Sequence, residues 1–439
     1  MILILAIKKR CFEPICEVFR NTDRENHRMY TIDRIPRVVN SFFRPHRAGF
    51  SKPAWSHFTL LVSVMAMAAE HGLKQLNALL RGHTHRTKDG EFLWQSAWDE
   101  CAVLRDIALN TLRRLYRKGE PLYLILDDTH IPKRGKKMQG VSKFYLHSQK
   151  RCGQAHCVLK VCLLYRGVTI PWGNWLYLKH DDAEALALPF ETLTNLAARA
   201  IREASVLDQT HRPVTVLFDS YYLCKTVVDA VQERHWHYIG VVKKNRRFFC
   251  HGAWHKVSTY GGNVLKRSGK KSKVPSRSGH RVYRLAERIG RLKSLGEGEV
   301  KLVFSARRDG HRIALATNDV RRSARKVVAD FSKRWSIEML IKDEKQQLGM
   351  CAYRVWRYRA VVRYLHLVDC AYACLTHLGM DALRAQGKNK DQDKELRLPT
   401  IRHLQADLRE KVWNQLITEV VKHSRERSVI RRLEKLRAA

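Results

Sequence analysis

The sequence lacks both paired cysteines and long apolar runs. Its 11 cysteines include no two separated by only two residues, and this scattered, odd-numbered set is typical of a reducing compartment. The longest apolar stretches, which begin at Thr59 and Leu365, are too short or too polar to span a bilayer. We therefore expect a cytoplasmic protein with no membrane partner.

Acidic residues are also scarce. The chain has 42 Asp and Glu against 82 Lys and Arg, so its formal net charge is +40, and the excess is spread along the whole length. A field of this sign concentrates polyanions, among which nucleic acid is the most common. The composition therefore predicts a nucleic-acid partner.

The spacing of apolar residues changes along the 439 residues, a length that allows two to three domains. Up to about Gly119, apolar residues recur every three or four positions, which predicts helices. The runs LYLILDD, VLKVCLLYRGV, VTVLFDS and WHYIGVVKK then predict strands, with helical stretches between the later ones. This order predicts an α/β protein with a mixed sheet.

Carboxylates follow two of these predicted strands. Asp127 and Asp128 end LYLILDD, and Asp219 follows VTVLF. Adjacent carboxylates at the end of a buried strand repel each other and lose hydration, so they need a cation or hydrogen-bond donors. Acids at the ends of two strands of one sheet can reach the same divalent ion, and Mg²⁺ prefers oxygen ligands. Either Asp127 or Asp128 can be the first ligand on this reasoning alone.

A third acid comes from the predicted helix VADFSKRWSIEMLIKDEKQQLG. At about 100° per residue, the face of Glu338 also carries one aromatic and two basic residues, Phe331, Arg334 and Lys345. Asp343 and Glu344 point away from that face, so Glu338 is the predicted third ligand. A row of surface ion pairs is the alternative for so charged a helix. Together the three acids predict a two-metal site for phosphoryl transfer.

The spacing Phe331-x2-Arg334-x3-Glu338-x6-Lys345 resembles the Y-x2-R-x3-E-x6-K signature of bacterial insertion-sequence transposases of the DDE type. The segments LDDTHIPKRGKKMQGV, VLFDSYY and ALATND extend the likeness, which covers residues 122–350 in order. A basic insertion between the second Asp and the Glu is also similar to that family. Phe331 departs from the signature because it lacks the tyrosine hydroxyl, a potential donor to a DNA phosphate.

The family resemblance implies a ribonuclease H-like mixed sheet flanked by helices. In that family the catalytic Asp commonly stands two residues before a Ser or Thr, which favours Asp127 over Asp128 because Thr129 follows. The implied domains are a helical DNA-binding region (1–119), a catalytic domain (120–375) interrupted by a basic β-rich insertion (245–298), and a helical C-terminal region (376–439).

The resemblance also implies the activity: a DNA transposase that cleaves element ends and joins them to a target, by cut and paste. Asp127, Asp219 and Glu338 would hold two Mg²⁺ ions, which Mn²⁺ can replace. The partner would be double-stranded DNA, bound by a homodimer at the bacterial nucleoid. The residues expected to contact DNA are Thr129, Lys133, Lys243, Lys244, Arg246, Trp254, Phe331, Arg334 and Lys345.

Two other classes of protein share the charge and the expected fold. One is a catalytically inactive, transposase-derived repressor, and the other is a nuclease that cuts without strand transfer. Trp254 also has two interpretations, because a tryptophan in a basic insertion can stack on a base pushed out of the duplex or pack in a core.

One cluster of His and Cys residues invites comparison with zinc sites. His147, Cys152, His156 and Cys157 lie within eleven residues, and each is a zinc-ligand type. Their spacing matches no common zinc pattern, and Cys157 leads into a predicted strand. We therefore expect ordinary buried or loop residues here.

Overall fold

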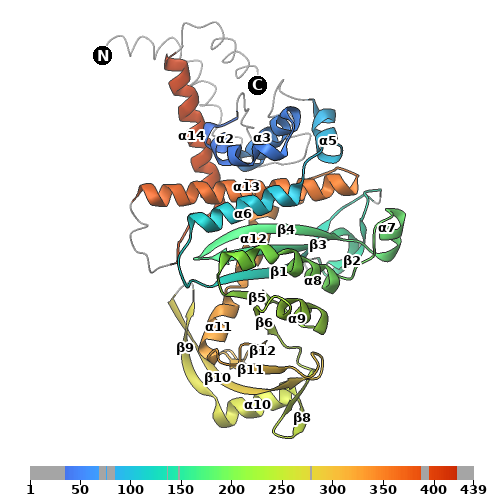
Figure 1. Ribbon diagram of the computed structural model, residues 1–439, viewed down its shortest axis with the longest axis vertical. Helices are drawn as coiled ribbons and strands as arrows, with labels where there is room; N and C mark the ends of the chain where they lie inside the picture. The colour runs from blue at the N-terminus through green and yellow to red at the C-terminus, as the bar shows by residue number, and fades with distance from the viewer. Residues whose placement is uncertain are drawn as a thin grey trace.

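A twelve-stranded mixed sheet runs through the computed structural model, which describes residues 35–68, 76, 85–135, 137–146, 149–276, 279–386 and 395–422. Its strand order is β2-β3-β1-β5-β6-β12-β11-β10-β7-β8, with β4 paired to β3 and β9 paired to β10. Figure 1 shows the sheet as the middle and lower part of an elongated molecule, with a helical layer above it.

The upper part of the sheet is ribonuclease H-like. Three antiparallel strands come first in the chain, and two strands parallel to the first follow, each after a helix. The antiparallel strands are β1 (Leu122–Pro132), β3 (Arg151–Tyr165) and β4 (Val168–Tyr177), with β2 (Ser142–Leu146) at the edge, and the parallel ones are β5 (Val214–Phe218) and β6 (His237–Val241). The predicted mixed sheet flanked by helices is confirmed.

Strand β1 is buried on both faces. Tyr123 and Ile125 point into one hydrophobic core, and Leu124 and Leu126 point into a second core on the other side. The first face is covered by α11 (Ala324–Ser332), α12 (Trp335–Gln347) and α13 (Tyr358–Ala385), the second by α8 (Leu193–Glu203), α9 (Lys225–Gln232) and α10 (Val257–Ser268). Residues that alternate along β1 therefore face different helices.

Strand β4 is absent from the sequence prediction, which treated VLKVCLLYRGV as one strand. Arg166 and Gly167 have φ of 50° and 80°, so the chain turns back there in a two-residue hairpin that matches the twist of the strands. Pro171 in β4 lies beside an irregularity in the β3–β4 pairing, where its missing N–H is tolerated. Because proline and glycine are uncommon inside strands, the sequence of β4 did not indicate a strand.

The helical layer packs on the β4 side of the sheet. Its long members are α6 (Glu100–Arg114) and α13, which both contact β4, and Figure 1 shows them side by side. The remaining helices of this layer are α2 (Arg37–Phe43), η2 (Arg44–Gly49), α3 (Lys52–Met67), α5 (Arg86–Trp94) and α14 (Ile401–Lys422). Within the described part of the chain, no helix is both long and apolar enough to cross a bilayer.

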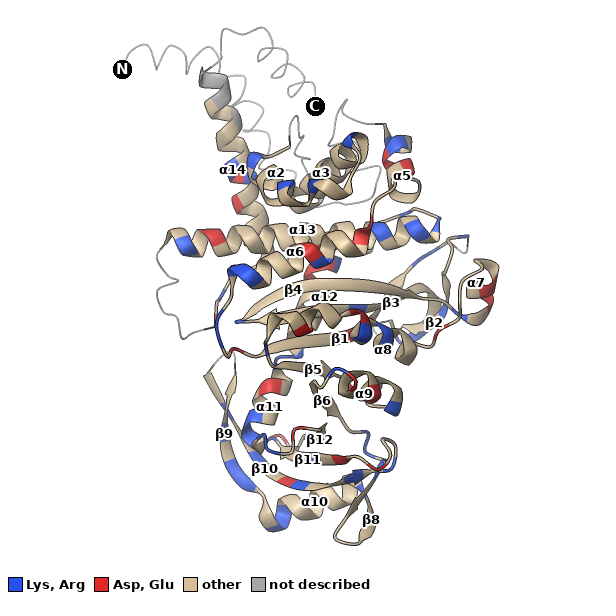
Figure 2. Ribbon diagram, viewed as in Figure 1, with Lys and Arg blue, Asp and Glu red and all other residues tan. Residues whose placement is uncertain are grey.

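The segment predicted as a basic insertion extends the same sheet downward. It contains β7 (Arg247–Cys250), β8 (Ala253–Lys256), β9 (Lys270–Ser276) and β10 (Gly279–Leu292), and β10 pairs with β11 (Glu299–Ala306), which pairs with β12 (Arg312–Thr317). Helix α10 inside it was not predicted. Figure 2 shows Lys and Arg gathered on α10, β9 and β10.

Two long helices predicted from the sequence are each broken. The predicted helix around Glu338 consists of α11 and α12, joined by a tight turn in which the Lys333 and Arg334 amides donate to carbonyls three residues back, each at 3.0 Å. The predicted helix after β4 consists of α7 (His180–Ala185) and α8, with Pro189 between them. The first break matters for function because it places Arg334 at the N-terminus of α12.

Candidate active site

Asp127 and Asp219 lie at neighbouring positions because β1 and β5 are parallel and in register. Ile125 pairs with Leu217, and each aspartate follows two residues later on its own strand. Ile125 and Leu217 belong to the same hydrophobic core, so alternation directs both aspartates to that face of the sheet. Asp219 Oδ1 accepts the amide of Tyr221 at 2.8 Å, which fixes the carboxylate in a tight turn.

Glu338 reaches the same face from α12 through a shared partner. Arg334 donates from Nη1 to Asp127 Oδ2 at 2.9 Å and from Nη2 to Glu338 Oε1. The three side chains are 18 to 30% exposed, so they form an accessible rim and not a buried core. One guanidinium therefore joins the strand acid to the helix acid.

The electrostatics at Asp127 are those of a crowded anionic site. The pKa of its carboxyl is raised to about 7, mainly by burial and also by the negative charges of Asp128 and Asp219, against the opposing effect of Arg334. The mutual repulsion shows that Asp219 is close enough to act on Asp127. A cation among these groups would favour their ionised forms.

Asp128 lies on the opposite face of β1 from Asp127. Its Oδ1 accepts a hydrogen bond from the Tyr222 hydroxyl at 2.9 Å, within the second hydrophobic core. The structure thus groups Asp127, and not Asp128, with Glu338 and Arg334.

The donor set on the Asp127 face fits Mg²⁺. Three carboxylates from β1, β5 and α12 supply hard oxygen atoms, and Mg²⁺ uses few protein carboxylates while keeping positions for water and phosphate. Arg334 supplies positive charge to two of these acids in the structure. Asp127, Asp219 and Glu338 are therefore the residues that could hold the metal.

Lys345 and Thr129 are bound to each other beside this site. Lys345 Nζ donates to Thr129 Oγ1 at 2.7 Å and to the His130 carbonyl at 2.9 Å, and burial lowers its pKa. Lys345 therefore ties the C-terminal end of α12 to β1, close to the acids.

Lys133 is directed into the protein. Its Nζ donates to the carbonyls of Cys351 and Tyr353 at 3.0 and 2.9 Å and lies 3.2 Å from the centre of the Tyr353 ring. Burial lowers its pKa to about 7. The structure gives Lys133 a packing role and does not bring it to the three acids.

The other expected DNA contacts lie at different distances from the acids. Phe331 is near, because the Arg334 guanidinium lies 5.9 Å from its ring, and Lys243 lies 5.7 Å from the ring of Tyr221, which follows Asp219. Lys244 is exposed and Arg246 half-buried on the same connection after β6. Trp254 is 43% exposed on β8, the last strand of the sheet order, so it neither fills a core nor approaches the acids.

A second group of charges lies behind the site and is fully enclosed. Lys160 on β3 places Nζ 2.7 Å from Glu344 Oε2 and donates to Asp369 and to Asn174. Burial would lower the pKa of Lys160, but the two carboxylates raise it above its ordinary value. Burial also raises the pKa of Glu344 well above normal, against the opposing effect of Lys160. We call Lys160, Asn174, Glu344 and Asp369 the buried charge cluster.

The buried charge cluster was missed from the sequence. It fixes α12 to β3, β4 and α13, so it holds the helix that carries Glu338. A signal was present: Lys160 and Asp369 each interrupt an apolar run, VLKVCLLY and LHLVDCAYACL. Charges inside such runs are almost always paired when buried.

In the His and Cys cluster, His156 and Cys152 have the predicted ordinary roles, while Cys157 is a buried residue of β3 near Asp128 and His130. His156 bonds through Nδ1 to the Tyr353 hydroxyl at 2.6 Å and through Nε2 to the Gln139 carbonyl at 3.0 Å, and Cys152 is exposed. His147 lies outside the described residues.

A family model for DDE superfamily endonuclease matches residues 49–287, more than half of the chain, and the chain therefore belongs to this family. The predicted DDE type is confirmed. The match contains Asp127, Asp128 and Asp219 and ends before Glu338, so the place of Glu338 comes from the structure.

Among solved structures, the chain is similar to the piggyBac transposase in a cryo-EM synaptic complex with hairpin DNA. The two are 13% identical, the TM-score is 0.44, and the alignment covers 90% of this chain and 80% of that chain. No curated protein sequence matches the chain.

Proposed function

We propose that this protein is the transposase of a bacterial insertion sequence, which cleaves double-stranded DNA at the element ends and joins them to a target. The observation that carries the proposal is the convergence of three acids: Asp127 lies within β1, Asp219 directly follows the parallel strand β5, and Glu338 reaches them from α12. Acids on two neighbouring strands beside a helical acid are an arrangement suited to phosphoryl transfer. The family of DDE endonucleases supports the same chemistry.

In this proposal the three acids hold two Mg²⁺ ions, or Mn²⁺ in their place. Such ions, when bound, activate the attacking water or 3′-hydroxyl and stabilise the leaving oxygen of an in-line displacement. The chain itself positions the acids by the β1–β5 register and by the attachment of α12 to the sheet. Arg334 is in place to exchange its carboxylate partners for a phosphate, which its planar fork binds in two-point fashion.

Exposed cations outline the proposed path of DNA beside the acids. Lys243 and Lys244 follow β6 next to the turn of Asp219. Further along the sheet, beyond β12 and β11, Figure 2 shows a basic face on α10, β9 and β10. The exposed members of this face are Lys266, Arg267, Lys270, Lys271, Lys273, Arg281 and Arg284. We propose that it grips the DNA backbone, and that two copies of the chain hold two element ends.

The decisive experiment uses the full chain with labelled DNA that carries both flanks of its coding sequence, a plasmid target and Mg²⁺. We expect breaks at the two ends and joined products, while Glu338→Gln binds the same DNA and gives neither. Cleavage without joined products would identify a nuclease, and binding without cleavage by the unsubstituted chain would identify a repressor.

A salt titration tests the DNA partner separately. If the basic face binds phosphates, a plot of the logarithm of the affinity against the logarithm of the salt concentration is a falling straight line. Its slope is about −0.9 for each phosphate that is neutralised. An affinity that does not change between low and moderate salt would contradict a DNA-backbone contact.

A further inference from the structure

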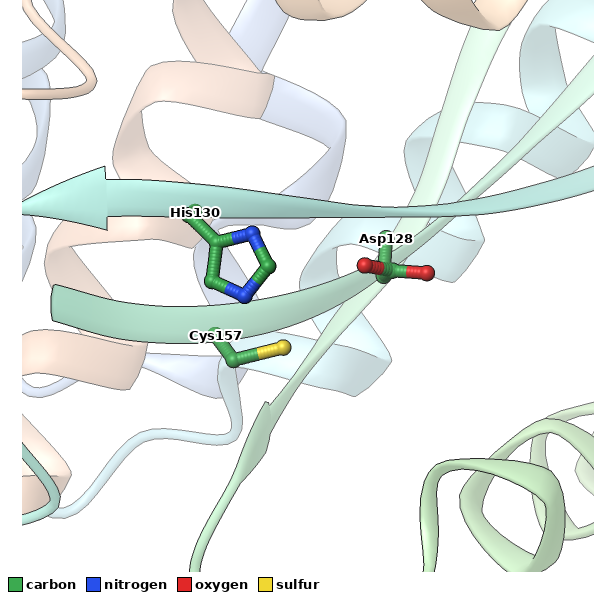
Figure 3. A group of neighbouring side chains, drawn as sticks. All are labelled: Asp128, His130 and Cys157. Carbon is green, nitrogen blue, oxygen red and sulfur yellow. The ribbon is translucent and has the colours of Figure 1, made fainter. Parts of the chain in front are cut away.

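Three side chains with metal-binding atoms meet on the face of β1 opposite Asp127 (Figure 3). Asp128 and His130 are two residues apart on β1, so they share a face, and Cys157 lies on β3 directly across from His130. One ligand atom of each lies within 4.8 Å of the other two, and no second group of this kind occurs in the described ranges.

We propose that Asp128, His130 and Cys157 bind one zinc-like transition-metal ion, distinct from the Mg²⁺ site of the three acids. The donors are one carboxylate oxygen, one imidazole nitrogen and one sulfur. This mixed set suits a borderline-soft ion such as Zn²⁺ and not Mg²⁺, which selects oxygen. Three protein ligands leave a fourth tetrahedral position for water.

The spacing requires only small adjustments. With bonds of about 2.0 to 2.3 Å, neighbouring donor atoms of a tetrahedral zinc site lie about 3.3 to 3.8 Å apart. Side-chain rotations that move each donor atom by about 1 Å would therefore bring the three to these distances. All three ligands come from two strands that hydrogen-bond to each other at these positions, which keeps the backbone geometry rigid.

Neighbouring groups already orient the ligands, as outer groups do around metal sites. The Tyr222 hydroxyl donates to Asp128 Oδ1 at 2.9 Å, and the ring of Phe144 lies 5.1 Å from that of His130. Lys345 holds the His130 carbonyl at 2.9 Å. The surroundings are therefore ordered on both sides of the strand.

Binding would exchange one proton for the ion. Cys157 is buried and free, and burial keeps its pKa above the ordinary thiol value, so it enters as S–H. The S–H bond breaks, its proton passes to buffer, and the sulfur bonds the metal, while His130 binds as neutral imidazole and Asp128 as carboxylate. No electron is transferred. The ion would clamp β1 to β3 next to Asp127, independently of the proposed DNA chemistry.

The test uses Co²⁺ as a spectroscopic probe of the full chain. We expect one equivalent to give a thiolate-to-cobalt absorption band and tetrahedral d–d bands, both displaced by Zn²⁺. Cys157→Ser should abolish the thiolate band, and His130→Gln and Asp128→Asn should each weaken Co²⁺ binding at least about 10-fold.

Two matched variants isolate the site. Cys162→Ser removes another buried thiol from the same strand, and Asp127→Asn removes an acid of the opposite face; both should keep the cobalt bands. The proposal is overturned if the unsubstituted chain shows no thiolate band, if Cys157→Ser retains it, or if the His130 and Asp128 variants bind as tightly as the parent.

A measurement on the unsubstituted chain covers the case in which a variant does not fold. X-ray absorption at the zinc edge should show one sulfur and otherwise nitrogen or oxygen neighbours. If no sulfur atom is bound to the zinc, Cys157 is not a ligand and the proposed site is wrong.

Discussion

The two ends of helix α12 each carry a glutamate beside a basic side chain, but in different surroundings. Glu338 is 30% exposed and shares Arg334 with Asp127, whereas Glu344 is 0% exposed and lies beside Lys160 and Asp369. At the accessible end, a metal can replace Arg334 as the partner of the two acids, and a phosphate can replace the acids as the partner of Arg334. At the enclosed end no exchange is possible, so the charges serve to hold the helix. A glutamate beside a basic residue can belong to a functional site or can only stabilise the fold. Residue types do not distinguish these two roles, but exposure to solvent does.

The largest expected effect is on the accessible end. Glu338→Gln keeps the size of the side chain and removes one metal-binding charge, so DNA cleavage should fall at least about 1,000-fold, or about 4 kcal/mol, in a gel assay. DNA affinity and urea unfolding serve as controls and should stay close to those of the parent. Measurable Mg²⁺-dependent cleavage by this variant would show that Glu338 is a structural acid.

A change at the enclosed end should act on folding first. Lys160→Met removes the ammonium group that contacts both Glu344 and Asp369 and leaves a buried negative charge unpaired, which lowers the free energy of unfolding by about 3 to 5 kcal/mol, measured by urea denaturation. Lys342→Met, on the exposed side of the same helix, is the matched control and should change it by less than about 0.5 kcal/mol. Equal effects of the two would remove the distinction between the ends of α12.

Two substitutions of Glu344 sharpen the same distinction. The raised pKa of Glu344 favours its protonated form, which Gln imitates, so Glu344→Gln should lower the free energy of unfolding by less than about 1 kcal/mol. Glu344→Ala leaves a cavity and unpaired neighbours and should cost about 2 to 3 kcal/mol. If Glu344→Gln abolished strand transfer while Glu338→Gln did not, the assignment of the two faces of α12 would be wrong.

The pKa of Asp127, about 7, predicts how the accessible end responds to pH. Because the folded pKa is above the unfolded value of about 3.9, the metal-free fold binds the extra proton between these values and loses stability as pH rises from about 4 to about 7. Mg²⁺ requires the ionised carboxyl, so its affinity should increase by up to about 10-fold per pH unit below pH 7 and level off above it.

Calorimetry in buffers with different ionisation enthalpies measures this directly. Mg²⁺ binding should release a proton at pH 6 and almost none at pH 8, and Asp127→Asn should release none at either. Equal proton release at both values by the parent would contradict the raised pKa.

The smallest effect is expected at Phe331, whose ring lies beside Arg334. Phe331→Tyr adds the hydroxyl that the transposase signature carries, and a hydrogen bond from it to a phosphate is worth at most about 1.5 kcal/mol. We expect transposition between unchanged and about 10-fold higher, measured by the yield of joined products. A severe loss would show that the ring edge faces a packed core and not the DNA.

Asp127 and Asp219 could be selected from the sequence because the pattern that marks them is local. A buried apolar run followed by a carboxylate identifies Asp127 and Asp219, and the parallel pairing of the two runs brings these acids together. The expectation that the first strand ends at Asp127 and Asp128 was wrong, because β1 continues to Pro132 through its antiparallel pairing with β3. The choice between Asp127 and Asp128 needed the structure, since alternation alone does not say which face of β1 meets α12. The break before α12 and the hairpin at Gly167 each depend on a single turn. The spacing of apolar residues is judged over many positions, so it does not reveal one turn.

The buried charge cluster could not be predicted in the same way. Lys160 and Asp369 are 209 residues apart, and their pairing is decided by how α13 crosses the sheet. The sequence shows that each must have a partner, because each interrupts an apolar run, but not which one. Long-range pairing of this kind is settled by packing and not by local pattern.

The bridge that Arg334 forms between Asp127 and Glu338 makes it a competitor of the metal in the proposed mechanism. While the guanidinium occupies these oxygens, a cation that binds there must displace it, and a phosphate that takes Arg334 away removes that competition. DNA and Mg²⁺ would then each increase the affinity for the other by the same factor, as thermodynamic reciprocity requires. Free enzyme would hold metal weakly, and the full complement of ions would assemble only on DNA.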